Sequence, residues 1–224
     1  MHRLVSFLAV SVLSVLTLAA QPAGKPAHTF NIGVQGGAAL SLNENAFTYR
    51  DNDKGADLFN GKGDIMLGYT FSGVFAMRLA ASFGKNSGAC NTEQTSGDGF
   101  YPYHFKSVNV FADAILNLSR SWEGFSPLLY AGIGGARSFG FSDAAHPWQS
   151  VSNNNNALGF RLGFIAQYNI SSAFSIYADF CGEAYSDKYD GLKPHKKDQQ
   201  EIEGYGGFPL DLRGVISLGI VFHY

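Results

Sequence analysis

The most constraining feature of this sequence is the stretch Leu210–Tyr224, in which apolar residues alternate with small or polar ones. A period of two places successive side chains on opposite faces of a β-strand. A strand that crosses a lipid bilayer needs about 9–11 tilted residues, with apolar side chains toward lipid, polar ones toward a lumen and aromatic residues at the membrane boundary. This stretch meets those requirements and ends on an aromatic residue. An edge strand of a soluble sandwich shows the same alternation, so the rest of the chain is needed to choose between the two.

The composition narrows the class of protein. The formal net charge is −2 over 224 residues, which gives no basic excess for binding nucleic acid and no strong acidity that would favour disorder. Aromatic residues make up 14% of the chain and charged residues only 15%, against about 25% charged in ordinary soluble domains. We therefore expect part of the surface to be covered by something other than water.

The first 28 residues are typical of an exported chain. His2 and Arg3 precede the apolar run Leu4–Leu18, and Ala19 and Ala20 form a small-residue cleavage site. We interpret residues 1–20 as a signal peptide and residues 21–28 as a short periplasmic leader. The remainder, residues 29–224, contains no apolar run of helical-span length, so entry into a membrane would require a closed barrel.

Eight stretches of the mature chain alternate with a period of two, and long polar connections and short turns join them in turn. The facing of the fifth stretch is left open by its sequence. Because outer-membrane barrels have even strand numbers, short periplasmic turns and long extracellular loops, the pattern predicts an all-β fold, an eight-stranded antiparallel up-and-down transmembrane β-barrel with four long extracellular loops. The stretches are Thr29–Leu40, Lys62–Phe71, Val74–Gly84, His104–Leu118, Pro127–Arg137, Ala157–Ile170, Ala173–Tyr185 and Leu210–Tyr224.

The second face of these strands favours a membrane barrel over a soluble one. It carries mostly Gly, Ala, Ser and Asn with a few charges, and almost none of the Lys, Glu and Thr that cover a soluble lipocalin-like barrel. Eight strands enclose a narrow lumen, in which charges must pair. We expect Arg161 to face Glu183 and Arg78 to face Asp113, because each pair lies at a similar height on neighbouring strands. The predicted network, which would plug the lumen, is completed by Asp64, Asp179, Asp211 and Arg213.

The sequence predicts that the protein is not an enzyme and has no metal site and no cofactor. The nearest catalytic arrangement is His104 with Ser107 and Asp98, but the odd spacing puts that His and Ser on opposite faces of a strand. Asp51–Asp53 lacks the glycine and distal glutamate of a calcium loop and is better interpreted as a solvated turn. An oxidising compartment permits a disulfide between Cys90 and Cys181, and whether they pair is left open. The basic run Lys193, His195, Lys196 and Lys197 has two interpretations, contact with lipopolysaccharide phosphates or a solvated loop, of which the second is commoner.

Four segments together resemble the barrel domain of OmpA-type outer-membrane proteins: Ser107–Ser119, Leu128–Gly134, Gly163–Asp190 and Gly214–Tyr224. The resemblance implies a multi-pass protein of the outer membrane of a Gram-negative bacterium, surrounded by lipid and lipopolysaccharide and inserted by the barrel-assembly machinery. The insertion signal of such proteins, a last strand with a terminal aromatic residue, matches Leu218, Ile220, Phe222 and Tyr224.

The peptidoglycan-binding domain of full-length OmpA-type proteins has no counterpart after the last strand, so the resemblance is to the barrel-only form. For that form the resemblance implies a structural or surface-interaction role, with an extracellular ligand reached through the loops. The alternative is an outer-membrane barrel enzyme or a small-solute channel.

Overall fold

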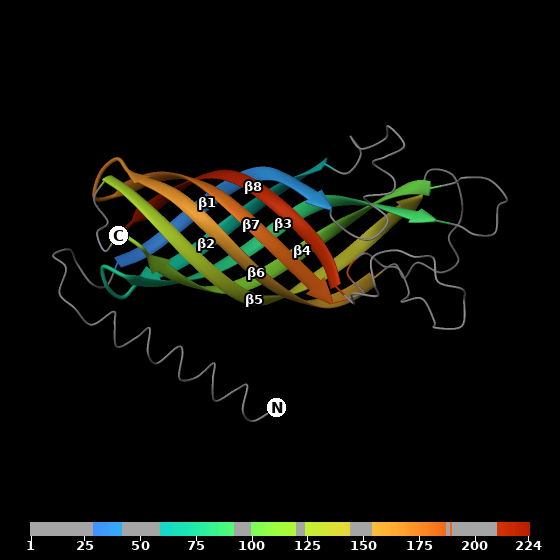
Figure 1. Cartoon of the computed structure of the whole chain (residues 1–224), viewed down its shortest axis with the longest axis horizontal. Coiled ribbons are helices and arrows are strands. Elements are labelled where there is room, and N and C mark those ends of the chain that lie inside the picture. The colour runs from blue at the N-terminus through green and yellow to red at the C-terminus, as the bar shows by residue number, and fades with distance from the viewer. Residues whose placement is uncertain are drawn as a thin grey trace, which may run out of the picture.

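The computed structural model of the chain describes residues 29–41, 59–91, 100–119, 124–143, 154–186, 189 and 210–224. The predicted signal peptide and leader lie outside these residues. Every element of the described part is a β-strand (Figure 1), and none of its residues forms a helix long and apolar enough to cross a membrane. The strands are β1 (Thr29–Ser41), β2 (Phe59–Thr70), β3 (Phe75–Asn91), β4 (Phe100–Asn117), β5 (Gly124–Asp143), β6 (Asn154–Asn169), β7 (Phe174–Ser186) and β8 (Leu210–His223).

The strands form one closed antiparallel barrel in which each pairs with its neighbours in sequence and β8 returns to β1. The closing seam aligns Asn31 with His223 and continues to Ser41 opposite Arg213. Beyond the last paired residue, the Phe30 nitrogen donates to the Tyr224 oxygen at 3.1 Å and the Tyr224 nitrogen donates back at 2.8 Å. The predicted all-β, eight-stranded up-and-down barrel is therefore confirmed.

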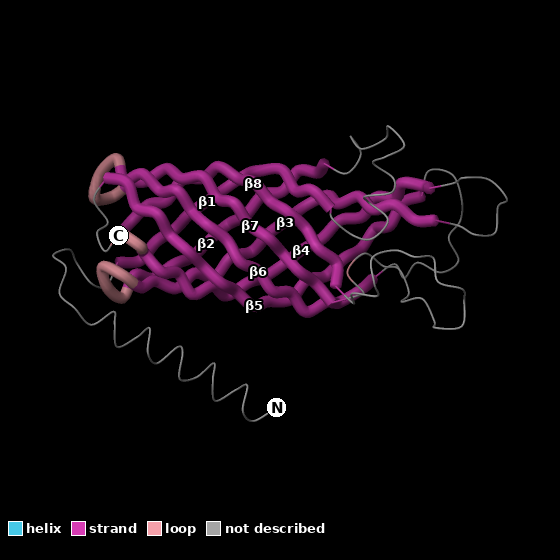
Figure 2. Tube along the Cα trace, viewed as in Figure 1, coloured by secondary structure: helices cyan, strands magenta, loops and turns pink. Residues whose placement is uncertain are grey.

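The two ends of the barrel differ. The connections from β2 to β3 and from β6 to β7 are tight turns at the end where Tyr224 lies, which we call the turn end (Figure 2). The Ser72 and Ser171 hydroxyls each accept a hydrogen bond from a backbone nitrogen inside their own turn, at 3.1–3.3 Å. Such serine-stabilised turns hold the hairpins in register. The opposite end, toward which β1 runs, is called the loop end.

Burial is inverted relative to a soluble barrel. Large apolar side chains point outward and are exposed, among them Phe30 at 65%, Leu162 at 68% and Leu218 at 69%. The inward positions hold polar, charged and aromatic side chains, together with a buried apolar group that includes Met66, Ile115, Leu128 and Ile165. The facing that the sequence left open on β5 follows this rule, because Tyr130 points inward at 2% exposure and Ile133 points outward at 54%.

Three strands extend at least four residues farther toward the loop end than their sequences predicted, and β2 and β6 extend three residues farther. β3 continues past Gly84 to Asn91, β4 begins at Phe100 rather than His104, and β5 continues past Arg137 to Asp143. Strand pairing continues here although the apolar alternation has stopped, and Phe105 and Phe141 pack against each other in this part of the barrel. A register shift between His104 and Lys106, together with Gly140 at φ 64°, marks a bulge in this extension.

Candidate functional site

Among the residues that the structure describes, the interior of the barrel contains eight buried charged side chains, four basic and four acidic. We call this set the lumen charge cluster. Its formal charge is zero because four cations face four carboxylates, so this set buries no excess charge of either sign. The members are Lys62, Arg78, Arg161, Arg213, Asp64, Asp113, Asp179 and Glu183.

Asp113 lies at the centre of the turn-side half of the cluster. Arg78 donates from Nε to Asp113 Oδ2 at 2.6 Å. Arg161 donates from Nε to Oδ1 at 2.7 Å and from Nη2 to Oδ2 at 2.5 Å, a bidentate arrangement. Charge-assisted bonds of this length are about twice as strong as neutral ones. One carboxylate therefore holds two guanidinium groups that come from β3 and β6.

Gly132 makes this contact possible. It is aligned with Asp113 on one side and with Arg161 on the other, so it separates the two charged residues by one strand. A Cβ atom at Gly132 would lie 2.1 Å from Asp113 Oδ1 and 3.2 Å from Arg161 Cγ. The absence of a side chain on β5 thus lets Arg161 reach past its neighbouring strand to β4.

Aromatic rings fill the space around these ion pairs. The Arg78 guanidinium lies 4.5 Å from the centre of the Tyr130 ring, and the Arg161 guanidinium lies 4.5 Å from that of Phe111. The Tyr130 hydroxyl donates to Asp179 Oδ1 at 2.9 Å, while Arg78 Nη1 lies 3.8 Å from Asp179 Oδ2. Cation–π contacts in a desolvated site are worth about 2 kcal/mol. The rings therefore stabilise the cations and exclude water together.

Glu183 is the centre of the loop-side half. It accepts from Lys62 Nζ at 2.6 Å, from the Tyr185 hydroxyl at 2.7 Å and from the Arg213 guanidinium in a very short pair. Arg213 also donates to Asn86 Oδ1 at 2.5 Å. The carboxylate has several donors, which is the condition under which a buried charge is tolerated.

The two halves are joined, so that all eight strands contribute to one network. Lys62 Nζ lies 3.5 Å from Asp64 Oδ1. The Gln35 amide bonds to the other Asp64 oxygen, and the Tyr177 hydroxyl donates to Gln35 Oε1 at 2.9 Å. The Tyr177 hydroxyl and Arg78 Nη1 each lie 3.5 Å from the Met66 sulfur, and Arg78 in turn binds Asp113, so this chain of contacts connects Glu183 on β7 to Asp113 on β4.

The structure brings together most of the predicted network, with different partners. Arg78 and Asp113 form the expected pair. Arg161 is aligned with Glu183 in the β6–β7 register, yet its guanidinium bonds to Asp113 on β4, and Glu183 is bound by Lys62 and Arg213. The expectation that Arg161 pairs with Glu183 is wrong because a long side chain selects the carboxylate its tip reaches across the lumen rather than the residue beside its Cα.

Two residues differ from expectation in their role. Asp211 lies on β8 nearer the loop end and is only partly buried. Lys62 was expected only as the first residue of a strand, whereas it is 6% exposed and bridges Glu183 and Asp64. Its signal in the sequence is the spacing of two from Asp64, which puts both side chains on the same inward face.

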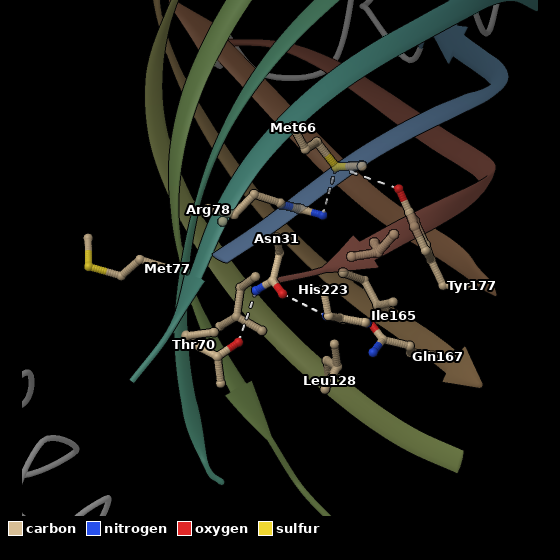
Figure 3. Close-up of a pocket in the computed structure, with 15 residues that line it drawn as sticks. Asn31, Met66, Thr70, Met77, Arg78, Leu128, Ile165, Gln167, Tyr177 and His223 are labelled. Carbon is tan, nitrogen blue, oxygen red and sulfur yellow. Dashed lines mark hydrogen bonds between the residues drawn. The ribbon is translucent and has the colours of Figure 1, made fainter. Parts of the chain in front are cut away.

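A small cavity lies between the cluster and the turn end (Figure 3). Its volume is about 60 Å³, and at about 10–15 Å³ per water it has room for a few molecules. Arg78 and Tyr177 point into it toward the Met66 sulfur, which lies 3.5 Å from each of their donor atoms. Near the turn end, Asn31 bonds to Thr70 at 3.0 Å, and the His223 ring nitrogen lies 2.6 Å from Asn31 Oδ1. The rest of the lining is mostly apolar.

His104 contacts a different serine from the one considered in the sequence. His104 Nδ1 lies 2.7 Å from the Ser87 hydroxyl, and Ser107 instead bonds to Asn86 and to Tyr189, each at 2.9 Å. Ser87 donates its proton to Asn60 Oδ1 at 2.9 Å. The Ser87 proton is therefore directed at Asn60, whereas a general base at His104 would have to accept it. Asp98 lies outside the described residues.

The other predicted features are distributed as follows. Leu218, Ile220, Phe222 and Tyr224 share the outward face at the turn end of the barrel. Cys181 is a free thiol on β7. The side chain of Cys90, the acidic turn Asp51–Asp53 and the basic run Lys193–Lys197 lie outside the described residues and side chains. No group of three or more His, Cys, Asp or Glu side chains in the described ranges is placed to hold a metal ion.

Known proteins resemble this chain in fold. No protein-family model matches this sequence, and no characterised protein matches it. A major outer membrane protein from Thermus thermophilus has a similar solved structure, with a TM-score of 0.50 and 13% identity over 87% of this chain and 99% of that one. Neisserial surface protein A has a TM-score of 0.48 and 17% identity over 88% of this chain and 97% of that one. The attachment invasion locus protein Ail of Yersinia pestis has a TM-score of 0.47 and 16% identity over 89% of this chain and 100% of that one. The chain has the fold of the small eight-stranded outer-membrane β-barrels, and the resemblance to OmpA-type barrel domains is confirmed at that level.

Proposed function

We propose that this protein is an integral, multi-pass barrel of the outer membrane of a Gram-negative bacterium, with a structural or surface-interaction role and a lumen closed by paired charges. The observation that carries the proposal is the inversion of burial: large apolar side chains cover the outside while four cations and four carboxylates lie inside. In water this arrangement would expose apolar surface and bury charge, both at a cost. In lipid the exposed apolar surface no longer carries that cost, and the buried charges are paired.

The outward face supports a membrane position in detail. On β5 the apolar outward positions extend from Phe125 to Ile133, followed by Gly135 and then Arg137. That length corresponds to the about 9–11 tilted residues that span a bilayer. We assign lipid and lipopolysaccharide as the partners of this surface. The outward row from Leu218 to Tyr224 is the surface we assign to recognition by the barrel-assembly machinery.

The lumen charge cluster supports a closed interior. A solute that passes from one end to the other must separate groups that are 2.5–2.7 Å apart, such as Arg161 and Asp113 or Lys62 and Glu183. Breaking one partner out of a buried ion pair costs about 3–5 kcal/mol. Several such pairs lie along the axis, so the barrel acts as a rigid support rather than a channel.

We assign the surface-interaction role to the loop end of the barrel. We assign no catalytic role to Ser87 and His104, because the Ser87 hydroxyl donates to Asn60 Oδ1. A rigid barrel that carries its long connections at one end is a common arrangement for binding at a surface. We assign any extracellular ligand to those connections, with no cofactor.

Planar-bilayer recordings of the purified wild-type protein test the closed lumen. Insertion is verified first by gel mobility, because a folded barrel migrates differently before and after boiling. We expect inserted protein to produce no steady single-channel current at moderate voltage. Regular current steps that scale with the amount of inserted, unboiled-form protein would contradict the proposal.

A further inference from the structure

Three basic side chains form a patch on the outside of the barrel at the loop-end limit of the apolar surface. Lys85 on β3, Lys106 on β4 and Arg137 on β5 are exposed and outward-facing. We call them the basic rim. Each is the first charged outward residue after an apolar stretch, since Phe83 precedes Lys85 by two positions and Ile133 precedes Arg137 by four. The basic rim therefore lies at the height where a lipid headgroup begins.

The register brings the three cations close together. Lys85 is aligned directly with Lys106. Arg137 is aligned with Val108, which puts it diagonally beside Lys106. Directly opposed residues have Cβ atoms about 4.5–5.5 Å apart and diagonal ones about 7–8 Å. Three flexible basic side chains on adjacent strands can thus reach one anionic group.

These charges have no acidic partner in the described structure. Among the side chains that it describes, no carboxylate lies within 4.0 Å of Lys85, Lys106 or Arg137. Arg137 donates from Nη2 to Asn154 Oδ1 at 3.5 Å, a long bond to a neutral group. Like charges placed opposite each other on a sheet are destabilising. The contrast with the lumen, where every cation has a carboxylate, leaves the basic rim available to an anion that is not part of the described structure.

We infer that the basic rim binds the phosphate groups of a phosphorylated glycolipid of the lipid A type in the outer leaflet. The inference rests on the proposed function, which places the loop end outside. The headgroup phosphates neutralise the three cations, while the acyl chains lie along the apolar residues Phe83, Val110 and Ile133 directly toward the turn end. The site is distinct from the basic run at Lys193–Lys197, because it is built on paired strands at the edge of the apolar surface.

The test compares two variants that remove the same number of charges. K85Q/K106Q/R137Q removes the basic rim, and K193Q/K196Q/K197Q removes three lysines from the connection between β7 and β8. Folded protein in detergent is titrated with diphosphoryl lipid A, with the same glycolipid lacking phosphates, and with phosphatidylglycerol, and complexes are counted by native mass spectrometry. Each basic residue near an anionic lipid surface contributes about fivefold in affinity, so we expect the rim variant to bind diphosphoryl lipid A on the order of 100-fold more weakly.

The connection variant should stay within about threefold of wild type, and removal of the phosphates should weaken wild-type binding as the rim variant does. A rim variant within about threefold of wild type, or an equal loss in both variants, would overturn the inference. Phosphatidylglycerol binding as tight as lipid A binding, with the same sensitivity to the rim variant, would overturn the assignment to a glycolipid. Wild-type protein that shows no heat-dependent mobility contradicts the proposed function, whereas folded variants with unchanged lipid A affinity contradict only the basic rim.

Discussion

Replacement of Gly132 by alanine tests whether the lumen charge cluster depends on a missing side chain. The new Cβ would lie 2.1 Å from Asp113 Oδ1, far inside contact distance, with Arg161 Cγ at 3.2 Å on its other side. Asp113 is 1% exposed and has two guanidinium partners. It therefore has little room to move without losing one of them, and we expect its bidentate bond with Arg161 to break.

The size of the effect follows from two opposing contributions. Breaking a buried ion pair by displacing one partner costs about 3–5 kcal/mol. Alanine in place of glycine inside a strand stabilises by roughly 0.5–1 kcal/mol, because the unfolded chain has less conformational freedom to lose. The expected net loss for G132A is about 2–4 kcal/mol in the free energy of unfolding.

Equilibrium urea unfolding of the barrel in lipid vesicles measures this difference, with the folded fraction read from unboiled gel mobility. The matched control is G61A, because Gly61 faces outward on β2 and a Cβ there would meet no atom within 4 Å. We expect G61A to equal or slightly exceed wild-type stability. If G132A unfolds at the same urea concentration as G61A, the proposed dependence of the Arg161–Asp113 contact on glycine is wrong.

Three further substitutions separate the inside of the barrel from the outside. R161E brings a second carboxylate beside the one that Arg161 binds, and we expect loss of folding on unboiled gels without any new ion current; a folded R161E barrel that conducts would contradict the closed lumen. K62M leaves Glu183 with fewer donors, and we expect a loss of about 1–3 kcal/mol in the same urea assay, whereas unchanged stability would mean that Lys62 contributes nothing. L162R replaces an outward-facing leucine that is 68% exposed by a charged residue. We expect the free energy of unfolding to fall by about 2–4 kcal/mol for L162R and by about 0–1 kcal/mol for N156R, which lies nearer the loop end. Equal effects would argue against a lipid-facing surface at Leu162.

The barrel was predictable from the sequence because a period of two is a local property. Leu210–Tyr224 alternates strongly enough to define a strand, and the short turn at Ser171 and Ser172 aligns Arg161 with Glu183 as expected. Inward and outward faces follow from that alternation once one strand is oriented. β5 was the exception, since its glycines and apolar residues occupy both faces.

The choice of partners inside the lumen was less predictable. Strand tilt and stagger in a closed barrel decide which side-chain tips meet, and these are properties of the whole barrel rather than of one hairpin. Arg161 therefore bonds to Asp113, two strands away, across Gly132. Lys62 was missed for the same reason, because Glu183 is far from it in sequence and lies on a strand that is not its neighbour.

The location of the protein in the outer membrane tests the central claim most directly. Cells that produce the full chain are separated into soluble and outer-membrane fractions, and each fraction is run on gels with and without boiling. The inverted burial predicts that the protein is found in the outer-membrane fraction and changes mobility on boiling. A protein recovered in the soluble periplasmic fraction, with one mobility before and after boiling, would contradict the account.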